Sequence, residues 1–179
     1  MEGHYVKTIA WMDGDTISVE TGRLARQADG AVVVRKGDIV LLATVVANRD
    51  IDPNIDFLPM SVDYKEHYAS TGKIPGGFFK RDGRLNEYEI LTSRLVDRSL
   101  RPLFPEDYHA NIQVIISLFS SDKEEQADAL ATFAASAAIA VSDVPFPDPV
   151  SSVRVMFKDG DYYINPRFSQ MEGSTLDLI

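Results

Sequence analysis

The sequence predicts an α/β fold in which α-helices are layered on mixed β-sheets. Three observations support this prediction: strand-like runs separated by glycine turns in the first third, two helical segments in the middle, and further strand signals near the end. The chain has 179 residues, which is enough for one domain with a hydrophobic core and too few for two. We therefore expect residues 1–179 to belong to a single domain.

Four strand-like runs come before residue 50. The runs HYVKTIAW and TISVETG flank Asp13-Gly14, which predicts a hairpin because both turn residues tolerate a positive φ. The runs AVVVRKG and IVLLATVVAN flank a second turn at Gly37-Asp38, and the latter run is apolar enough to predict a strand covered on both faces. A fifth run, DFLPMSVDYKE, contains Pro59, which favours an edge strand or a bulge.

Two helices follow, with the strand NIQVIISLFS between them. The first is expected from about Glu87 to Arg101, because Pro102 cannot continue a helix. The second is rich in alanine and is expected to reach about Ser142, after a capping box formed by Ser121 and Glu124. Its small side chains predict a central, buried helix.

The last part of the chain again favours strands. The stretch SVRVMFKDGDYYINP predicts a hairpin that turns at about residues 159–161. The final residues, STLDLI, have strand character without a cap, turn or polar tail. We expect the chain to stop inside an element, with the fold incomplete at its C-terminal end.

Composition excludes several classes of function. The formal net charge of −9 argues against wholesale nucleic-acid binding by a basic surface, and no DNA partner is expected. The absence of cysteine excludes disulfides and thiolate metal sites. The longest apolar run has 13 residues, whereas a membrane span needs about 20, and no leader peptide is visible. We therefore expect a soluble, cytoplasmic protein.

No metal site is expected in the chain. The acidic stretch at residues 50–56 resembles a calcium loop but lacks the required glycine and the final glutamate. The three histidines are scattered, at His4, His67 and His109. An acidic turn and three ordinary histidines are the better interpretation.

The stretch PGGFFKRDGR combines aromatic and basic side chains in a glycine-rich loop. Phe78 and Phe79 offer ring faces on which bases stack, and Lys80 and Arg81 offer cations for a phosphate backbone. This composition predicts contact with single-stranded RNA. The alternative is a loop whose aromatic rings insert into a neighbouring domain.

Arginines continue into the first helix. Arg94, Arg98 and Arg101 share one helical face, and Arg84 precedes them in the loop. These four side chains are candidates for contacts to phosphate or to the RNA backbone. The alternative is a structural network of ion pairs, in which Arg98 and Arg101 bind Asp97, Glu106 or a neighbouring protomer.

Three segments carry a resemblance to a known family. The segments GRLARQADGAVVVRKGDIVLLATVV, IPGGFFKRDGRLNEYEILTSRLVDRSLRPLFPE and SAAIAVSDVPFPDPVSSVRV occur in this order. Together they resemble the first ribonuclease-PH-like domain of the polynucleotide phosphorylase family, over essentially the whole chain. The resemblance implies a ribonuclease-PH-like fold that is truncated at its C-terminal end.

The resemblance also implies an activity for the complete protein. The family degrades RNA from its 3′ end with inorganic phosphate, releases nucleoside diphosphates and can run in reverse as a polymerase. It forms a ring-shaped homotrimer, can join an RNA-degradation complex, and binds Mg²⁺ in a second ribonuclease-PH-like domain outside this chain. The loop Phe78–Arg81 would line the entry to the central channel, although many members have arginine where this chain has Lys80.

Comparison with ribonuclease PH implies that this segment has no catalytic residue. Arg84 matches an arginine that helps to hold phosphate, but the second phosphate contact, Gly-Thr-Arg, is replaced here by DKEEQAD. Asp122, Glu124 and Glu125 would place carboxylates at the positive end of the alanine-rich helix and repel phosphate. We expect the segment to thread RNA and to support the trimer. The alternatives are a pure trimerisation scaffold without RNA contact and a stand-alone nuclease with its own phosphate site.

Overall fold

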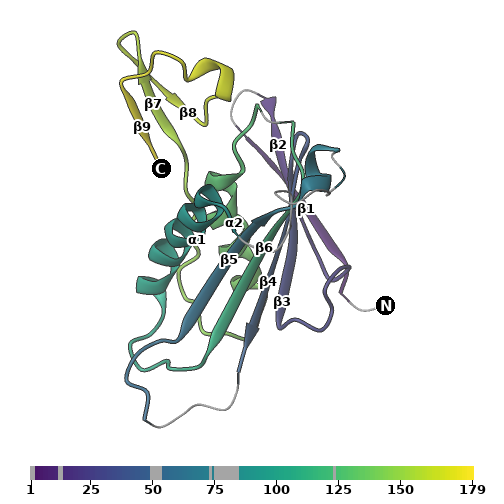
Figure 1. Cartoon of the computed structure of the whole chain (residues 1–179). Coiled ribbons are helices and arrows are strands. Elements are labelled where there is room, and N and C mark those ends of the chain that lie inside the picture. Colours follow the sequence, from purple (N-terminus) through teal and green to yellow (C-terminus); the bar gives the residue numbers. More distant parts are fainter. Residues whose placement is uncertain (1–2, 12–13, 49–53, 73, 75–84, 123) are drawn as a thin grey trace.

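The computed structural model describes residues 3–11, 14–48, 54–72, 74, 85–122 and 124–179. Its elements form two sheets and two α-helices (Figure 1). The larger sheet has six strands in the order β1-β2-β3-β4-β6-β5, and the smaller has three in the order β8-β7-β9. The prediction of helices layered on mixed sheets is confirmed.

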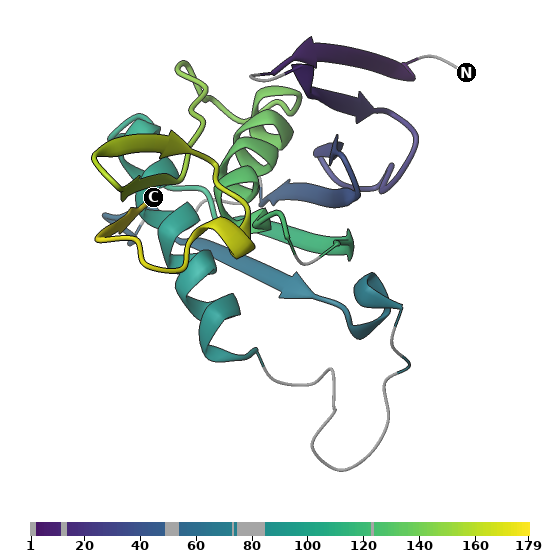
Figure 2. The same ribbon diagram turned by 90° about the horizontal axis from the view of Figure 1, so that it is seen from above.

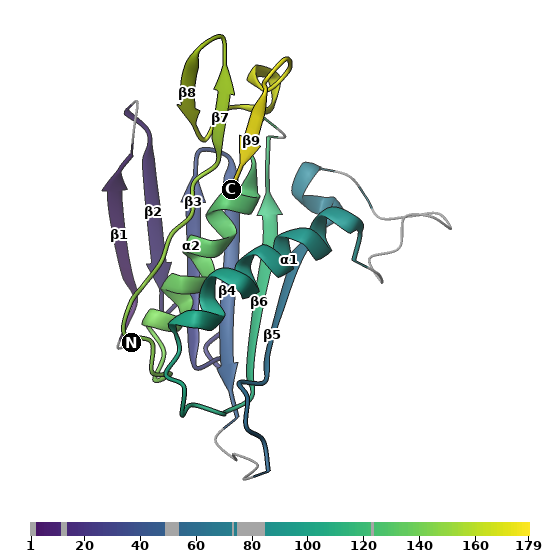
Figure 3. The ribbon, with the colours of Figure 1, turned by 90° about the vertical axis from the view of Figure 1, so that its left-hand side faces the viewer.

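The six-stranded sheet is antiparallel except at one edge, where β5 runs parallel to β6. Its strands are β1 (Tyr5–Ala10), β2 (Thr16–Thr21), β3 (Gly30–Lys36), β4 (Ile39–Ala47), β5 (Met60–Glu66) and β6 (Ile112–Ser120). Figure 3 shows β1 and β5 at opposite edges of this sheet. Both predicted hairpins are present, since β1 pairs with β2 and β3 with β4, and the edge position that Pro59 favours for β5 is confirmed.

Helices α1 (Glu87–Leu100) and α2 (Ala127–Ala140) lie across one face of this sheet (Figure 3). Helix α1 packs on β5, and α2 packs on β3 and β4. The core forms where apolar strand residues meet α2, and its members include Val32, Val34, Leu41, Ala43, Val45, Val114, Ile116, Ala131, Ala134 and Ala138. The expected central, buried helix is therefore α2.

Small side chains let α2 approach the sheet closely. A Cβ atom built on Gly30 of β3 would collide with the carbonyl oxygen of Ala138 in α2. Any larger side chain at position 30 would have to push the helix away from the strand. This contact explains why position 30 holds glycine.

The expectation that the run IVLLATVVAN is covered on both faces is wrong. In β4, every second residue from Ile39 to Val45 is buried, whereas the residues between them are only partly buried and Val46 is 46% exposed. The reason is that both helices pack on the same face of the sheet. An apolar run can thus form a strand with one half-covered face.

The predicted capping box of Ser121 and Glu124 is also wrong. Asp122 Oδ1 instead accepts hydrogen bonds from the backbone amides of Glu124 and Glu125, each at 3.0 Å. This turn delays the helix, which begins at Ala127 after the N-cap residue Gln126. The local side-chain bond of an aspartate has replaced the expected cap.

The smaller sheet consists of β7 (Val155–Lys158), β8 (Asp161–Ile164) and β9 (Leu176–Leu178). It contains the predicted hairpin at residues 159–161 and the predicted strand within STLDLI. Figures 1 and 2 show it on the side of the large sheet that carries the two helices. Three short 3₁₀ helices complete the described elements: η2 (Tyr68–Thr71), η3 (Arg101–Leu103) and η4 (Phe168–Gln170).

Candidate nucleic-acid interface

The aromatic and basic loop of the sequence prediction falls outside the described residues. This applies to Phe78, Phe79, Lys80, Arg81 and Arg84. The structure does describe the two ends from which this segment departs. One end is Gly72, directly after η2, and the other is Asn86, the N-cap residue of α1.

Glu89 ties the second of these ends to the large sheet. Asn86 Oδ1 accepts a hydrogen bond from the Glu89 amide at 2.9 Å, and Glu89 Oε2 accepts one from the Asn86 amide at 2.6 Å. The other carboxylate oxygen, Oε1, accepts a bond from the Glu66 amide at the end of β5, at 2.8 Å. One buried carboxylate therefore caps α1 and fixes it to β5. The sequence analysis missed this capping box, although the pattern Asn-x-x-Glu signals it.

Arg94 and Arg98 are exposed on α1, one helical turn apart. They line an open depression together with Leu91, Leu95 and residue Ile179. Within the described part of the chain, neither guanidinium has an ion pair or a hydrogen bond. Two cations with unused donors thus face solvent from the same helix that begins at the end of the loop.

Arg101 differs from the two arginines before it. Its Nη2 lies 2.6 Å from Asp97 Oδ1, and its Nε donates to Asp97 Oδ2 at 3.1 Å. Its Nη1 and Nη2 also donate to the carbonyl oxygens of Leu58 and Met60, at 2.7 and 3.0 Å. This confirms the ion-pair alternative with Asp97 for Arg101, which joins the end of α1 to the start of β5.

The start of α2 holds its carboxylates differently from the sequence expectation. Asp122, Glu124 and Glu125 precede the helix, and Glu125 pairs with Lys36 at 3.0 Å. The acidic residue in the first turn is Asp128, which is 3% exposed and lies 2.7 Å from Arg154 Nη1. The positive end of α2 is therefore occupied by a carboxylate, but one that the sequence analysis did not single out.

Burial shifts several protonation equilibria between β5 and the first turns of the helices. Burial raises the pKa of Tyr64 far above its ordinary value, and the nearby Glu66 adds to the shift. Burial likewise raises the pKa of Tyr88, with Asp128 as the next cause. Both phenols therefore remain protonated hydrogen-bond donors at neutral pH, and the Tyr64 hydroxyl donates to Glu66 Oε1 at 2.9 Å.

Glu66 is the carboxyl group in this region whose charge is disfavoured. Burial raises its pKa, the nearby carboxylates of Glu89 and Asp128 add to the shift, and the bond from Tyr64 partly offsets it. Perturbed carboxyl groups gather at functional sites, but they also occur in structural networks. The bonds that Glu89 and Asp128 make to the backbone and to Arg154 favour a structural network here.

The described ranges contain no group of three or more histidine, aspartate and glutamate side chains that could hold a metal ion. Nor does this part of the chain contain a helix long and apolar enough to cross a lipid bilayer.

Comparison with known proteins places this geometry in a family. The family model described as "3' exoribonuclease family, domain 1" matches residues 14–145. The chain is 57% identical to proteins named polyribonucleotide nucleotidyltransferase from Parabacteroides distasonis and Cytophaga hutchinsonii, over 97% of its own length. It spans 23% and 24% of these two relatives, so it corresponds to about a quarter of their length.

Solved structures show the same fold at low sequence identity. Rice Rrp46 matches with a TM-score of 0.63 at 18% identity, over 86% of this chain and 69% of that one. The Archaeoglobus fulgidus exosome, solved with RNA bound to its active site, matches with a TM-score of 0.60 at 17% identity, over 90% and 70%. The predicted ribonuclease-PH-like fold is confirmed, and the chain belongs to the 3′ exoribonuclease family.

Proposed function

We propose that the chain is the N-terminal part of a polyribonucleotide nucleotidyltransferase. The complete enzyme degrades single-stranded RNA from the 3′ end with inorganic phosphate, releases nucleoside diphosphates and can run in reverse as a polymerase. The single observation that carries this proposal is the 57% identity to proteins of that name over 97% of the chain. Residues 1–179 then form most of the first ribonuclease-PH-like domain, in a cytoplasmic enzyme.

Within that enzyme, the segment threads RNA and supports a homotrimer, and it carries no catalytic residue. Phe78, Phe79, Lys80 and Arg81 supply stacking faces and cations for the strand. The exposed guanidinium groups of Arg94 and Arg98 support a second contact to the RNA backbone, while Arg101 is occupied within the chain. The carboxylate of Asp128 at the start of α2 disfavours a phosphate site there.

The Mg²⁺ that the family uses belongs to the second ribonuclease-PH-like domain. The described residues of this chain do not fit such an ion, because they offer no cluster of carboxylates or histidines for it. We assign the chemistry of the metal to that second domain because the resemblance to the family implies it. The complete enzyme would join an RNA-degradation complex as the assembled homotrimer.

Replacing both phenylalanines tests the RNA contact. The double variant Phe78→Ala, Phe79→Ala should weaken binding of single-stranded RNA by about 1–3 kcal/mol per stacked base and should reduce processivity. The matched control is Phe57→Ala, which removes an aromatic ring that is 61% exposed outside the loop. Unchanged affinity and processivity in the double variant would instead support a scaffold that holds the trimer without touching RNA.

A separate assay tests the assignment of no catalysis. The 179-residue chain is incubated with single-stranded RNA and inorganic phosphate, and nucleoside diphosphates are measured by chromatography. We expect no release above background from this chain and release from the complete enzyme. Phosphate-dependent release by the chain alone would show a stand-alone nuclease with its own phosphate site.

A further inference from the structure

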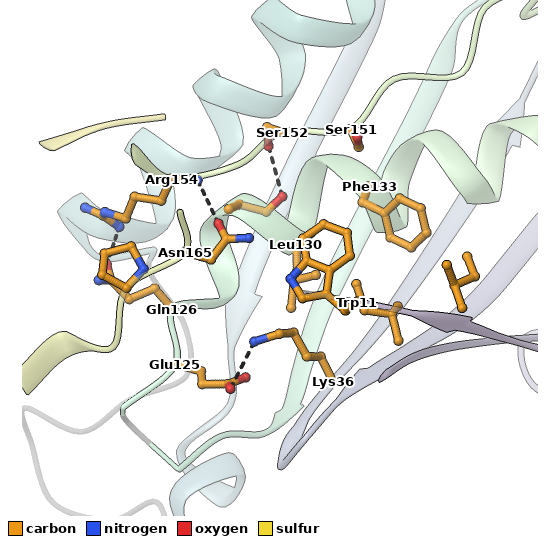
Figure 4. A pocket seen from close by; sticks show the side chains of 14 residues that line it. Trp11, Lys36, Glu125, Gln126, Leu130, Phe133, Ser151, Ser152, Arg154 and Asn165 are labelled. Atoms are coloured by element: carbon orange, nitrogen blue, oxygen red, sulfur yellow. Dashed lines mark hydrogen bonds and ion pairs between the residues drawn. The ribbon is translucent and has the colours of Figure 1, made fainter. Parts of the chain in front are cut away.

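A cavity of about 200 Å³ lies where the small sheet joins the large one, beside the start of α2 (Figure 4). Its walls come from β1, β2, α2 and the chain on either side of the β7–β8 hairpin. Much of the lining is apolar, as Figure 4 shows around Leu130, and includes Ile9, Trp11, Ile17, Leu130 and Phe133. Because an apolar cavity of about 150 Å³ can bind benzene, this space is large enough for an aromatic ring.

The charged groups at one side of the wall are paired with each other. Lys36 Nζ lies 3.0 Å from Glu125 Oε1 and 3.8 Å from Asp15 Oδ2. The second oxygen of Glu125, Oε2, is buried beside Gly37, so a molecule in the cavity does not reach it. A charged guest would have to break the buried pair of Lys36 and Glu125, which is costly.

Other polar groups of the wall are likewise occupied. Ser152 Oγ donates to the Ala129 carbonyl oxygen at 2.9 Å, and Asn165 Oδ1 accepts a hydrogen bond from the Arg154 amide at 2.8 Å. The guanidinium group of Arg154 pairs with carboxylates in α2 and β9. A water molecule needs two to four polar partners, and groups that are already bonded offer it few. The cavity therefore favours an apolar guest.

We propose that this cavity binds a neutral aromatic ring, either single or fused to a second ring. The rings of Trp11 and Phe133 come from different parts of the wall, the first from the end of β1 and the second from α2. A ring that packs against them gains edge-to-face or offset contacts, which an aliphatic chain does not make. The volume limits the guest to about this size.

A bound ring would strengthen the attachment of the small sheet. Two of the walls, α2 and the chain before β7, are already joined by the ion pair of Asp128 and Arg154 at 2.7 Å. A guest that packs between these walls binds the folded chain and not the unfolded one, so it stabilises the fold by mass action. The site can thus be detected through stability as well as through binding.

Toluene and benzoate test the proposal as a matched pair, because both carry one ring and only benzoate is charged. Trp11 lines the cavity and is the only tryptophan of the chain, so its emission reports occupancy. Titration of the 179-residue chain with toluene to millimolar concentration should change this emission and raise the midpoint of thermal unfolding. Benzoate should require at least about tenfold higher concentrations, because the described cations of the wall are already paired.

Two variants locate the site. Ala129→Leu puts an isobutyl group where a methyl group lines the cavity, and it should abolish the response to toluene. Phe133→Leu keeps an apolar wall but removes a ring, and it should weaken toluene binding by about 2–10-fold. Phe146→Leu is the matched control, because Phe146 packs against the core as Phe133 does but is not a wall residue of this cavity. Toluene binding should not change in that variant.

A further ligand, N-acetylphenylalaninamide, separates two sources of the ring, because it carries a phenylalanine side chain on a peptide backbone. Tighter binding than that of toluene assigns the cavity to a side chain of a partner protein, whereas weaker binding assigns it to a free small molecule. Either result supports an aromatic site. The inference does not depend on the proposed function, because every readout is binding or stability rather than phosphorolysis.

Two results would overturn the proposal. One is that neither toluene nor N-acetylphenylalaninamide at millimolar concentration changes Trp11 emission or the unfolding midpoint. The other is a response to toluene that Ala129→Leu leaves unaltered. Thermal unfolding shows whether each variant is folded. If Ala129→Leu does not fold, unaltered toluene binding in Phe133→Leu is the contradicting result instead.

Discussion

Arg154 donates a hydrogen bond from Nη1 to Asp128 Oδ2 at 2.7 Å, across 26 residues of sequence. Asp128 lies in the first turn of α2, whereas Arg154 immediately precedes β7. The same guanidinium donates from Nε and Nη2 to Asp177 in β9, at 2.6 and 2.8 Å. A single side chain therefore connects the helix of the large sheet to the small sheet.

Removing this guanidinium should destabilise the fold strongly. Arg154→Gln leaves the carboxylate of Asp128, which is 3% exposed, without its cation. Breaking a buried ion pair in this way costs about 3–5 kcal/mol of unfolding free energy. Urea denaturation measures the loss.

Arg35→Gln is the control for that measurement, because Arg35 is exposed on β3. We expect it to change the unfolding free energy by less than about 0.5 kcal/mol. A similarly small effect of Arg154→Gln would show that the pair contributes little to the attachment of the small sheet.

Asp177 should make the stability depend on acid pH. The hydrogen bonds from Arg154, and then its charge, hold the pKa of Asp177 below its ordinary value. A carboxyl group whose pKa is lower in the folded state stabilises the fold above its unfolded pKa, and this stabilisation is lost as pH falls through the folded pKa. Asp177→Asn should therefore be less stable than the unaltered chain at neutral pH, and the difference should shrink below a pH of about 4.

Urea denaturation of both proteins at a series of pH values measures this difference. Asp107→Asn, at an exposed position, serves as the control. Its unfolding free energy should change with pH in the same way as that of the unaltered chain. A difference between Asp177→Asn and the unaltered chain that stays constant down to strongly acid pH would contradict the ion pair with Arg154.

Local signals in the sequence predict most elements of this fold. The turn at Gly37-Asp38 has a glycine with a φ of +53°, and the strands on either side pair as expected. Helix α1 ends just before Pro102, as the ring of proline requires. The start of α2 could not be predicted in this way, because Ser121 and Asp122 both offer a side-chain acceptor and the structure uses Asp122.

The candidate site is less predictable, because its contacts are distant in sequence. The pair of Arg101 with Asp97 follows from helical spacing, but the bonds from Arg101 to Leu58 and Met60 span 43 and 41 residues. No periodicity signals such bonds. The arginine row therefore looks uniform in sequence, whereas in the structure Arg101 is held by bonds within the chain and Arg94 and Arg98 are exposed.

Glu66 should lower stability when it is charged. Burial raises its pKa, so the folded state binds its proton more tightly than the unfolded state does. Stability from this group is then lost as pH rises through and above the ordinary carboxyl range. Glu66→Gln removes the charge and keeps an oxygen for the Tyr64 hydroxyl, so the variant should be more stable than the unaltered chain at neutral pH.

This gain should disappear in acid, where Glu66 is protonated in both states. Chemical denaturation at neutral and acid pH measures it, with the exposed Glu106→Gln as a control that should show no gain. Lower stability of Glu66→Gln at neutral pH would mean that the charged carboxylate holds the network together.

The arginines of α1 should separate into two classes by salt dependence and stability. The double variant Arg94→Gln, Arg98→Gln should bind single-stranded RNA with a weaker dependence on salt. The slope of log binding constant against log salt concentration should become shallower by about 0.7 for each phosphate that the variant no longer neutralises. The unfolding free energy of this variant should not change. Arg101→Gln should leave the slope unchanged and lower the unfolding free energy by about 1–2 kcal/mol, because two carbonyl groups and Asp97 lose their donor. Fluorescence anisotropy with labelled RNA at several salt concentrations, together with urea denaturation, measures both quantities. If replacing Arg94, Arg98 or Arg101 changed the salt slope equally, Arg101 would have to leave Asp97 when RNA binds. All three arginines would then contact the RNA backbone.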